Sequence, residues 1–281
     1  MTPYQDWRKN QKPHISPSAM DMYFRCGEQY RRRYIENEKI PPAVALLKGR
    51  AVHKAAEVNY REKMKTGEDL PEATLLEAAG EEFESTYRAE GLFLSPEEES
   101  IGSKKVLGEA MDSSIRLTSL FRHGVAPRVE PAIIEQFIRV ELPKHSHDLL
   151  GRIDVVDKSA KIRDLKTSTR RKPQSEIDSS DQMTFYHVAY ERLTGKPAAG
   201  VVLDVLVDKA TPEVQTLEAN RGDKDRAILA NRLNAMLNGI KAGVFLPATP
   251  GHWCCSPRFC GYWPTCPFVN AERTAAAAAL A

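Results

Sequence analysis

The run of short segments that follows Pro127 constrains the fold more than any other feature of this sequence. Three segments are rich in β-branched residues, alternate in part between apolar and polar side chains, and are separated by turn-like stretches, which predicts consecutive antiparallel strands. They are residues 129–142, 149–157 and 161–167. A helix over about 177–194 and a near-continuous apolar run over 199–207 follow, and this run indicates a strand buried on both faces. The order β-β-β-α-β therefore predicts an α/β protein.

The first part of the chain has a helical pattern. Ser16 and Pro17 make a good helix start, as the N-cap and the first helical residue. Helices are predicted over about 19–35, 46–65, 71–90 and 96–122. Cys26 falls inside the first of these or just past a kink in it. Two further elements are predicted after the buried strand, a weaker strand near 214–217 and a helix over about 222–242.

We expect one structural domain made of three regions. They are an N-terminal helical region (1–126), a core that contains the sheet (127–245), and a C-terminal cysteine-rich segment with an Ala-rich tail (246–281). With 42% hydrophobic and 28% charged residues, the 281-residue chain is long enough and apolar enough to bury a sizeable core. The tail is of low complexity and is assigned no function.

Composition and missing motifs narrow the classes of function. No stretch is apolar enough to cross a bilayer and the N-terminus has no apolar signal region, so we expect a cytoplasmic protein of a prokaryotic or phage-infected cell. The formal net charge of +2 conceals two basic clusters, 31–33 and 170–172, which suit phosphate contacts but are more typical of a solvated face. Phosphate-binding loop, G-x-S-x-G and H-E-x-x-H motifs are absent, which disfavours ATPases, serine hydrolases and zinc proteases. Any helicase would be a partner in trans.

A carboxylate and lysine pattern carries the chemistry. Asp164 and Lys166 are two apart on a predicted strand, so both side chains leave one face while Leu165 packs on the other. The preceding strand carries Asp154, and a short hairpin sets it beside Asp164. Two carboxylates and one ammonium suit phosphodiester hydrolysis: the carboxylates hold Mg²⁺ or Mn²⁺, the metal polarises the phosphoryl group, and the lysine orients or activates water. An isolated D-x-K is usually a solvated strand face, so the surrounding motifs decide.

Four further residues accompany this pattern. Gln182 and Tyr186 lie four residues apart on one face of the following helix. Glu135, on the first strand, supplies another carboxylate. His53 lies upstream on a helix, one turn after Gly49, although a lone helical histidine is more often a surface or core residue than a ligand.

The order of these motifs resembles the RecB-like branch of the PD-(D/E)XK nuclease superfamily. The matching motifs are G-x-x-x-H (Gly49, His53), G-x-x-D (Gly151, Asp154), D-x-K (Asp164, Lys166) and Q-x-x-x-Y (Gln182, Tyr186). The resemblance implies a restriction-endonuclease-like core, a mixed central sheet flanked by helices. It implies metal-binding or metal-serving roles for His53, Asp154, Asp164 and Lys166, and a place in the DNA-binding cleft for Gln182 and Tyr186. The resemblance implies a role for Glu135 less strongly, because the strand that carries it has no equally sharp motif.

The five cysteines are unevenly placed. Four lie between Cys254 and Cys266, and the fifth is far away at Cys26. A cytosolic chain keeps its thiols reduced, so the clustering points to metal ligation rather than to disulfides. Three C-terminal thiolates with Cys26 would supply the four ligands of a [4Fe-4S] cluster or of a tetrahedral zinc, and the usual zinc pattern of two C-x₂-C pairs is absent. Such a site would tie together segments more than 200 residues apart, which favours a structural role.

An early cysteine followed by C-x₄-C-x₅-C-P is similar to the iron–sulfur subset of RecB-like nucleases, which includes AddB nuclease domains and CRISPR-associated exonucleases. The resemblance implies the ligands Cys26, Cys255, Cys260 and Cys266. The first step is longer than is common in that group, so Cys254 and Cys255 remain alternatives, and zinc remains the alternative metal. The aromatic residues among these cysteines either shield the cluster, which we favour, or stack on single-stranded bases. They are Trp253, Phe259, Tyr262 and Trp263.

These features predict a divalent-metal-dependent deoxyribonuclease, an exonuclease on single strands or duplex ends, used in recombination, repair or phage DNA processing. DNA is the expected partner, with a helicase or recombination protein in trans. The alternative from another class is a non-catalytic DNA-binding or adaptor subunit of a larger nucleic-acid-processing complex. Cleavage of DNA by the purified chain discriminates the two.

Overall fold

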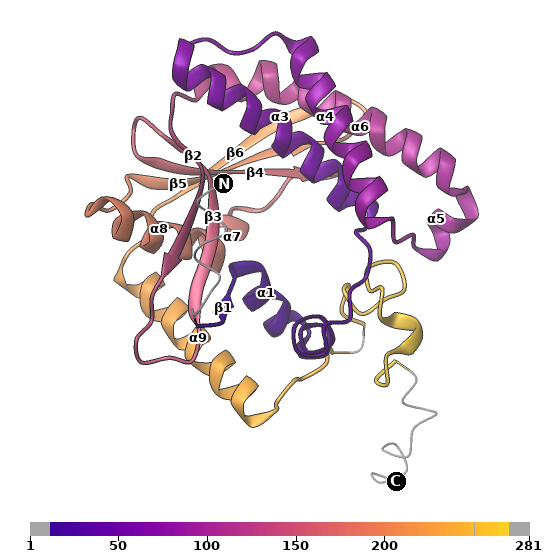
Figure 1. Ribbon diagram of the computed structural model, residues 1–281, viewed down its shortest axis with the longest axis vertical. Coiled ribbons are helices and arrows are strands. Elements are labelled where there is room, and N and C mark those ends of the chain that lie inside the picture. Colours follow the sequence, from indigo (N-terminus) through magenta and orange to yellow (C-terminus); the bar gives the residue numbers. More distant parts are fainter. Residues whose placement is uncertain (1–11, 250, 270–281) are drawn as a thin grey trace.

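The computed structural model describes residues 12–249 and 251–269. The Ala-rich tail and the first eleven residues named above lie outside this range. A six-stranded mixed sheet forms the centre, with β1-β3-β4-β5-β6 as neighbours and β2 also paired with β3 (Figure 1). Its strands are β1 (His14–Ile15), β2 (Pro131–Val140), β3 (Asp148–Asp157), β4 (Lys161–Ser168), β5 (Gly200–Val207) and β6 (Glu213–Ala219). The expected α/β fold with a mixed sheet flanked by helices is confirmed.

Strand directions follow the predicted hairpins. The strands β2, β3 and β4 are consecutive and antiparallel, as expected from the turns between them. The buried apolar strand β5 runs parallel to β4, and β6 pairs antiparallel with β5. The parallel step requires a crossover connection, which the helical segment between β4 and β5 supplies. Only the short β1, paired parallel with the start of β3, has no counterpart in the predicted pattern, because two residues carry no periodicity.

Two helical predictions need correction. The helices are α1 (Pro17–Arg25), α2 (Gly27–Tyr30), a π-helical turn (Arg31–Ile35), α3 (Val44–Thr66), α4 (Glu72–Glu90), α5 (Pro96–Ile101), α6 (Ser103–Gly124), α7 (Gln174–Asp178), α8 (Asp181–Thr194) and α9 (Asp223–Ala242). The single helix predicted over 96–122 is interrupted at Gly102, whose φ of 94° is incompatible with a continuing helix. The helix predicted from about 177 starts instead at Asp181, capped by the Ser180 side chain, after the separate turn α7.

The first helix ends at the cysteine that the sequence singled out. Ser16 caps α1 and accepts a hydrogen bond from the backbone of Ala19, with Pro17 at the first helical position. Cys26 then adopts an extended conformation with φ −159° and ψ 100°, so it separates α1 from α2. The kink expected near Cys26 is therefore real, and it turns the thiol out of the helix.

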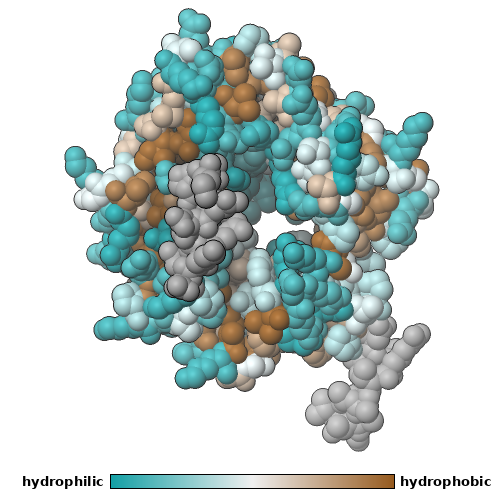
Figure 2. Space-filling view, in the orientation of Figure 1, coloured by the Kyte–Doolittle hydropathy of each residue, from teal (hydrophilic) through white to brown (hydrophobic). Residues whose placement is uncertain are grey.

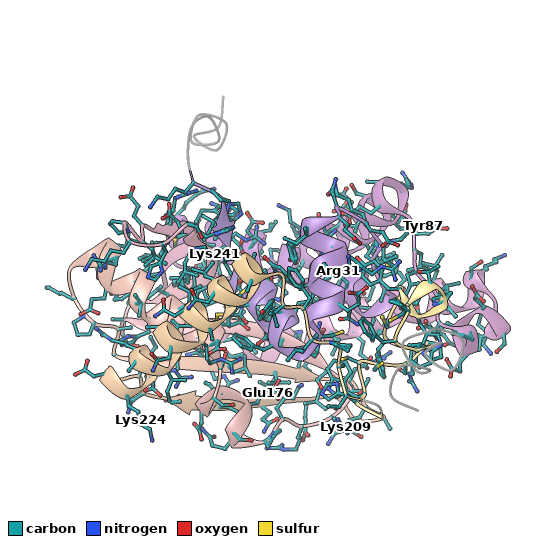
Figure 3. The ribbon with its side chains drawn as sticks, turned by 90° about the horizontal axis from the view of Figure 1, so that it is seen from below. Arg31, Tyr87, Glu176, Lys209, Lys224 and Lys241 are labelled. Carbon is teal, nitrogen blue, oxygen red and sulfur yellow. The ribbon has the colours of Figure 1, made fainter. Side chains whose placement is uncertain are left out.

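Two apolar cores lie on the two faces of the sheet. On one face α3, α4 and α6 pack against Val155, Leu165 and Leu206. On the other face α1, α8 and α9 pack against Ile153, Ile162 and other strand residues. Figure 1 shows these two groups of helices on either side of the strands. Figure 3, where Lys224 and Lys241 mark the two ends of α9, shows the course of that helix, which packs on α8 and α1. Within the described ranges, no helix is long and apolar enough to cross a membrane.

The cysteine-rich segment packs beside α1 and α2 (Figure 1). The backbone N–H of Gly27 donates a hydrogen bond to the carbonyl of Leu246. A Cβ at Gly27 would stand 2.7 Å from backbone atoms of Phe245 and Leu246. The Tyr262 hydroxyl donates to the Glu38 carbonyl at 2.6 Å. Close backbone approach at Gly27, which only glycine allows, thus joins two ends of the sequence.

Candidate active site

The site forms where two strands separate. The ladder between β3 and β4 consists of Val155 with Arg163 and Val156 with Ile162. Asp154 and Asp164 are the next residues on each strand, at the point where pairing stops. The Leu165 N–H, which has no β3 carbonyl opposite it, donates to Asp154 Oδ2 at 3.3 Å. Opening of the ladder therefore brings both carboxylates to one place and gives a backbone donor to one of them.

His53 reaches this place from α3, on the face of the sheet that α3, α4 and α6 cover. Its Nδ1 lies 3.3 Å from Asp154 Oδ2. Gly49, one turn earlier, faces Thr167, whose hydroxyl oxygen would lie 3.9 Å from an added Cβ. That is an ordinary contact, so packing leaves room for a small side chain at Gly49. His53 and Asp154 are brought together as the motif order implied.

Lys166 connects the strands to α8. Its Nζ lies 2.8 Å from Asp164 Oδ2 and donates to Gln182 Oε1 at 3.2 Å. Gln182 Nε2 in turn donates to the Tyr186 hydroxyl oxygen at 2.8 Å. The four-residue spacing of Gln182 and Tyr186 thus places both on the helix face that meets β4. These contacts form one continuous chain from Asp164 to Tyr186.

The close approach of α8 to β3 explains the glycine of the G-x-x-D motif. A Cβ at Gly151 would lie 2.4 Å from Cε1 of Phe185 and 3.2 Å from Cε1 of Tyr186. Real Cβ atoms do not come so close to aromatic carbon, so any larger residue would push α8 away from the strand. Gly151 therefore sets the distance between Tyr186 and Asp154.

Glu135 stands in an unusual backbone conformation. By the β2–β3 register, in which Ile134 pairs with Val155 and Gln136 with Ile153, it lies opposite Asp154. Its φ is +49°, a left-handed value that an L residue in a strand adopts only at a cost of about 1–2 kcal/mol. Strained backbone of this kind clusters at functional sites. The weaker sequence assignment of Glu135 is thus supported by placement and by strain.

Burial and like charge shift the acidities of these groups. Burial, with the charge of Asp154 adding to it, raises the pKa of Glu135 to about 7, although Arg152 lies 2.8 Å away and opposes the rise. Burial also raises the pKa of Asp154; the charge of Asp164 adds to the rise, while His53 and Lys166 oppose it. Two neighbouring carboxylates with raised pKa values are what we expect where a bound cation would supply the missing positive charge.

The donor set suits a hard divalent cation. Glu135 Oε2 and Asp164 Oδ2 are buried and make no hydrogen bond of good geometry within the described residues. Carboxylate oxygens suit Mg²⁺ and Mn²⁺, whereas an imidazole nitrogen is a ligand more typical of transition metals. As placed, no three His, Cys, Asp or Glu side chains of residues 12–249 and 251–269 form a coordination group. Each carboxylate instead contacts a basic side chain: His53, Lys166 or Arg152.

Two cavities meet at Lys166. One, of about 740 Å³, lies between α3, α4 and the strands and is lined by His53, Glu135 and Asp154. The other, of about 490 Å³, lies toward α1 and α8 and is lined by Asp21 and Gln182. Lys166 and Thr167 line both. Figure 2 shows the corresponding face hollowed near its centre, with a mostly hydrophilic rim. A substrate backbone that crosses this hollow passes Lys166.

Sequence reasoning gave no role to two charged residues of the first cavity. Arg152 lies between Gly151 and Asp154 in the motif, and Glu57 lies one turn after His53 on α3. Glu57 contacts Lys54 at 3.1 Å and Arg61 at 2.8 Å. The four-residue spacing from His53 is a signal that could have indicated Glu57. For Arg152 the available signal is strand alternation, because Arg152 lies two residues before Asp154 and so shares its face of β3.

The five cysteines are reduced thiols, and within the described residues no three of them, alone or with His, Asp or Glu, are placed as a group that could hold a metal ion. Burial raises the pKa of Cys255 and of Cys260, and the neighbouring thiols add to both shifts; for Cys255 these are Cys26, Cys266 and Cys260. Burial also raises the pKa of Cys254, with Cys26, Cys255 and Cys260 adding to the shift and Arg25 opposing it, and its Sγ lies 3.0 Å from Nδ1 of His252. Crowded thiols that resist ionisation are chemically suited to a cationic metal centre, which would hold them as thiolates.

The aromatic residues of this segment divide into two groups. Tyr262 is buried, and Arg32 covers its ring at 4.8 Å, as expected for shielding. Trp253 and Phe259 are exposed, so the favoured expectation that the aromatics shield a cluster is wrong for them.

The two basic clusters are largely paired. Arg31 contacts Glu28 and Glu36, and Arg32 contacts Glu38. In the second cluster Arg171 contacts Glu213 and Lys172 contacts Glu176. The solvated-face interpretation therefore holds for most of these residues.

The fold and the site define a nuclease-type α/β core, in which separating strands present carboxylates and a lysine to a cleft. The chain belongs to the PD-(D/E)XK nuclease superfamily, whose family model matches residues 14–267. Members of this superfamily generally use divalent metals such as Mg²⁺.

One solved structure shares the fold. The crystal structure of a candidate exonuclease from Eubacterium rectale aligns with 97% of this chain and 92% of its own, with a TM-score of 0.57 and 12% identity. A second crystal structure, of SSO0001, aligns with 92% of this chain and 88% of its own, with a TM-score of 0.44 and 13% identity. No curated protein matches the chain significantly.

Proposed function

We propose that this protein is a divalent-metal-dependent deoxyribonuclease that degrades single strands or duplex ends during recombination, repair or phage DNA processing. The observation that carries the proposal is the convergence of Asp154, Asp164 and Lys166 at the point where β3 and β4 separate. The superfamily membership supports the nuclease chemistry. The opening of the site into two cavities supports a substrate that runs across it, as a polynucleotide does.

The residues that would hold the metal are His53, Asp154 and Asp164, with Glu135 as an added carboxylate. A bound Mg²⁺ or Mn²⁺ supplies Lewis-acid polarisation of the phosphoryl group and acidifies bound water. The chain's own contribution is to gather the carboxylates where the β3–β4 ladder opens, to bring in Glu135 through its left-handed backbone, and to hold α8 close to β3 at Gly151.

Lys166 acts as a cation. Burial lowers its pKa, but the charges of Asp164 and Asp154 outweigh this and raise it, so the amine is protonated at neutral pH. An ammonium has three donors. Asp164 and Gln182 engage two of them, which leaves one for the attacking water or for a phosphoryl oxygen. Lys166 therefore orients and stabilises charge rather than abstracting a proton.

Gln182 and Tyr186 would extend this arrangement toward DNA. Burial raises the pKa of Tyr186, and the charges of Asp164 and Asp154 raise it further, so the hydroxyl stays neutral. Its oxygen accepts from Gln182, and its proton remains available as a donor. We assign Gln182 to positioning Lys166 and Tyr186 to donating toward a phosphate.

We further propose that Cys26, Cys255, Cys260 and Cys266 hold a [4Fe-4S] cluster that staples α1 to the C-terminal segment. The mutual electrostatic influence of the clustered thiols, which includes Cys254, supports a shared site. The contact of Cys254 with His252 leaves it the spare thiol. Measurement of iron, sulfide and zinc after anaerobic purification tests the metal: zinc without iron would decide for a zinc-stapled nuclease.

Cleavage assays test the enzymatic proposal. With 5′- and 3′-labelled single-stranded, duplex and circular DNA and Mn²⁺, we expect degradation from ends by the wild type. Asp154→Asn and Lys166→Ala should lose at least about 100-fold in rate, the order seen when a preorganised charge is removed. Lys158→Ala, an exposed lysine in the β3–β4 turn, is the matched control. DNA binding without cleavage under any divalent metal would favour the adaptor alternative.

A further inference from the structure

Two aromatic side chains on the cysteine-rich segment are held in the open. Trp253 is 56% exposed and Phe259 is 55% exposed, and their rings meet edge to face at 5.4 Å. A soluble protein gains nothing in stability from exposing two large rings side by side, since burial of each would contribute about 1.5–3 kcal/mol. The pair belongs neither to the apolar cores nor to the shield around Tyr262.

Two guanidinium groups flank these rings. Arg25 lies 5.4 Å from the Trp253 ring centroid, and Arg258 lies 5.4 Å from that of Phe259. In the part of the chain that the structure describes, neither arginine forms an ion pair with a carboxylate, and Arg25 Nε is buried without a hydrogen-bond partner. The surface made by Arg25, Trp253, Arg258 and Phe259, called here the Trp253 surface, therefore joins two guanidinium groups outside ion pairs to two half-exposed rings, of which that of Trp253 also meets the His252 ring at 5.7 Å.

The first helix links the Trp253 surface to the candidate active site. Ser18 and Asp21 of α1 line the cavity that Lys166 also lines. Arg25 lies four residues after Asp21 and seven after Ser18, so the three share one face of α1. The rise from Asp21 to Arg25 is about 6 Å, one helical turn. A single DNA strand that left the cavity along this face of α1 would meet the Trp253 surface next.

Resting on the nuclease function proposed above, we propose that the Trp253 surface binds the single-stranded part of the DNA substrate, with bases stacked on Trp253 and Phe259 and phosphates beside Arg25 and Arg258. Aromatic platforms with adjacent arginine are the physical means of holding single strands without reading sequence. Duplex DNA offers no such contact, because its bases already stack on one another. The surface therefore selects unpaired strands at the entrance to the cleft.

Binding measured without cleavage tests this inference. Anisotropy of a fluorescein-labelled dT₁₂ strand is recorded in EDTA with the full chain, its metal content and melting temperature checked first. Trp253→Ala and Phe259→Ala should each weaken binding roughly 10-fold, and Trp253→Phe should retain most of it. Phe268→Ala removes a ring of the same segment that is 50% exposed, and should leave binding unchanged.

A blunt-ended hairpin duplex provides the second arm. The affinity for this duplex should fall less than about 3-fold in the same alanine variants. Duplex DNA would bind through its phosphates, and these contacts do not involve the two aromatic rings. Equal losses for hairpin and dT₁₂, or dT₁₂ binding unchanged by both alanine variants, would overturn the inference. Cleavage is measured separately. If the wild type cuts DNA but both alanine variants bind dT₁₂ as the wild type does, the Trp253 surface is refuted and the nuclease proposal stands. If the variants bind dT₁₂ more weakly but the wild type never cuts, only the nuclease proposal is refuted.

Discussion

Glu135→Gln should make the metal-free protein more stable while disabling the site. The carboxyl has a pKa of about 7 in the folded protein, against an ordinary value of 4.5. The difference of about 2.5 corresponds to roughly 3 kcal/mol by which ionisation of Glu135 opposes folding. Glutamine keeps the size of the side chain and the left-handed backbone, so the substitution isolates the charge. Arg152 is half-exposed and loses little when its partner becomes neutral.

The sign of the pH dependence follows from the raised pKa. Below pH 4.5 the carboxyl is protonated in both the folded and the unfolded chain, so it carries no penalty. As the pH rises toward 7, the unfolded chain releases its proton first and the folded state loses stability. The advantage of Glu135→Gln over the wild type should therefore be about 3 kcal/mol at pH 8 and under about 1 kcal/mol at pH 5.

Urea unfolding in EDTA at the two pH values measures this difference. Glu141→Gln, an exposed glutamate just after the same strand, is the matched control and should change stability by less than about 0.5 kcal/mol. Added Mg²⁺ should stabilise the wild type more than Glu135→Gln, since a ligand stabilises the state that binds it. A variant no more stable than the wild type at pH 8, or equally stabilised at pH 5 and pH 8, would refute the reasoning.

Two further predictions concern packing and the cysteines. Gly151→Ala should destabilise the fold by about 1–3 kcal/mol, because the added Cβ would lie 2.4 Å from the Phe185 ring. Thermal unfolding measures the change. An unchanged melting temperature would contradict this account of the packing. Cys26→Ser should lose most of its bound iron and have a lower melting temperature, whereas Cys254→Ser should keep its iron. Iron analysis of the purified variants measures this. Loss of iron from Cys254→Ser but not from Cys26→Ser would show that Cys254 is a ligand and Cys26 is not.

Much of the fold was readable from local pattern. The hairpin strands, the buried strand and the cap at Ser16 depend on periodicity and turn chemistry that neighbouring residues supply. The break at Gly102 was missed because a glycine is tolerated within a helical pattern, and only the packing of α5 and α6 requires its φ of 94°. Likewise β1 is too short to signal itself and exists only through pairing with β3.

The candidate site divides in the same way. The two-residue spacing of Asp164 and Lys166 and the four-residue spacing of Gln182 and Tyr186 are set by the strand and helix periods, so the sequence alone determines which side chains share a face. The strain at Glu135 and the distance held by Gly151 come from the way β2, β3 and α8 meet. Exposure of Trp253 beside Arg25 comes from the path of the C-terminal chain past α1. Local periods are encoded within a few residues, whereas these features depend on contacts between segments far apart in sequence, which only the packed tertiary structure defines.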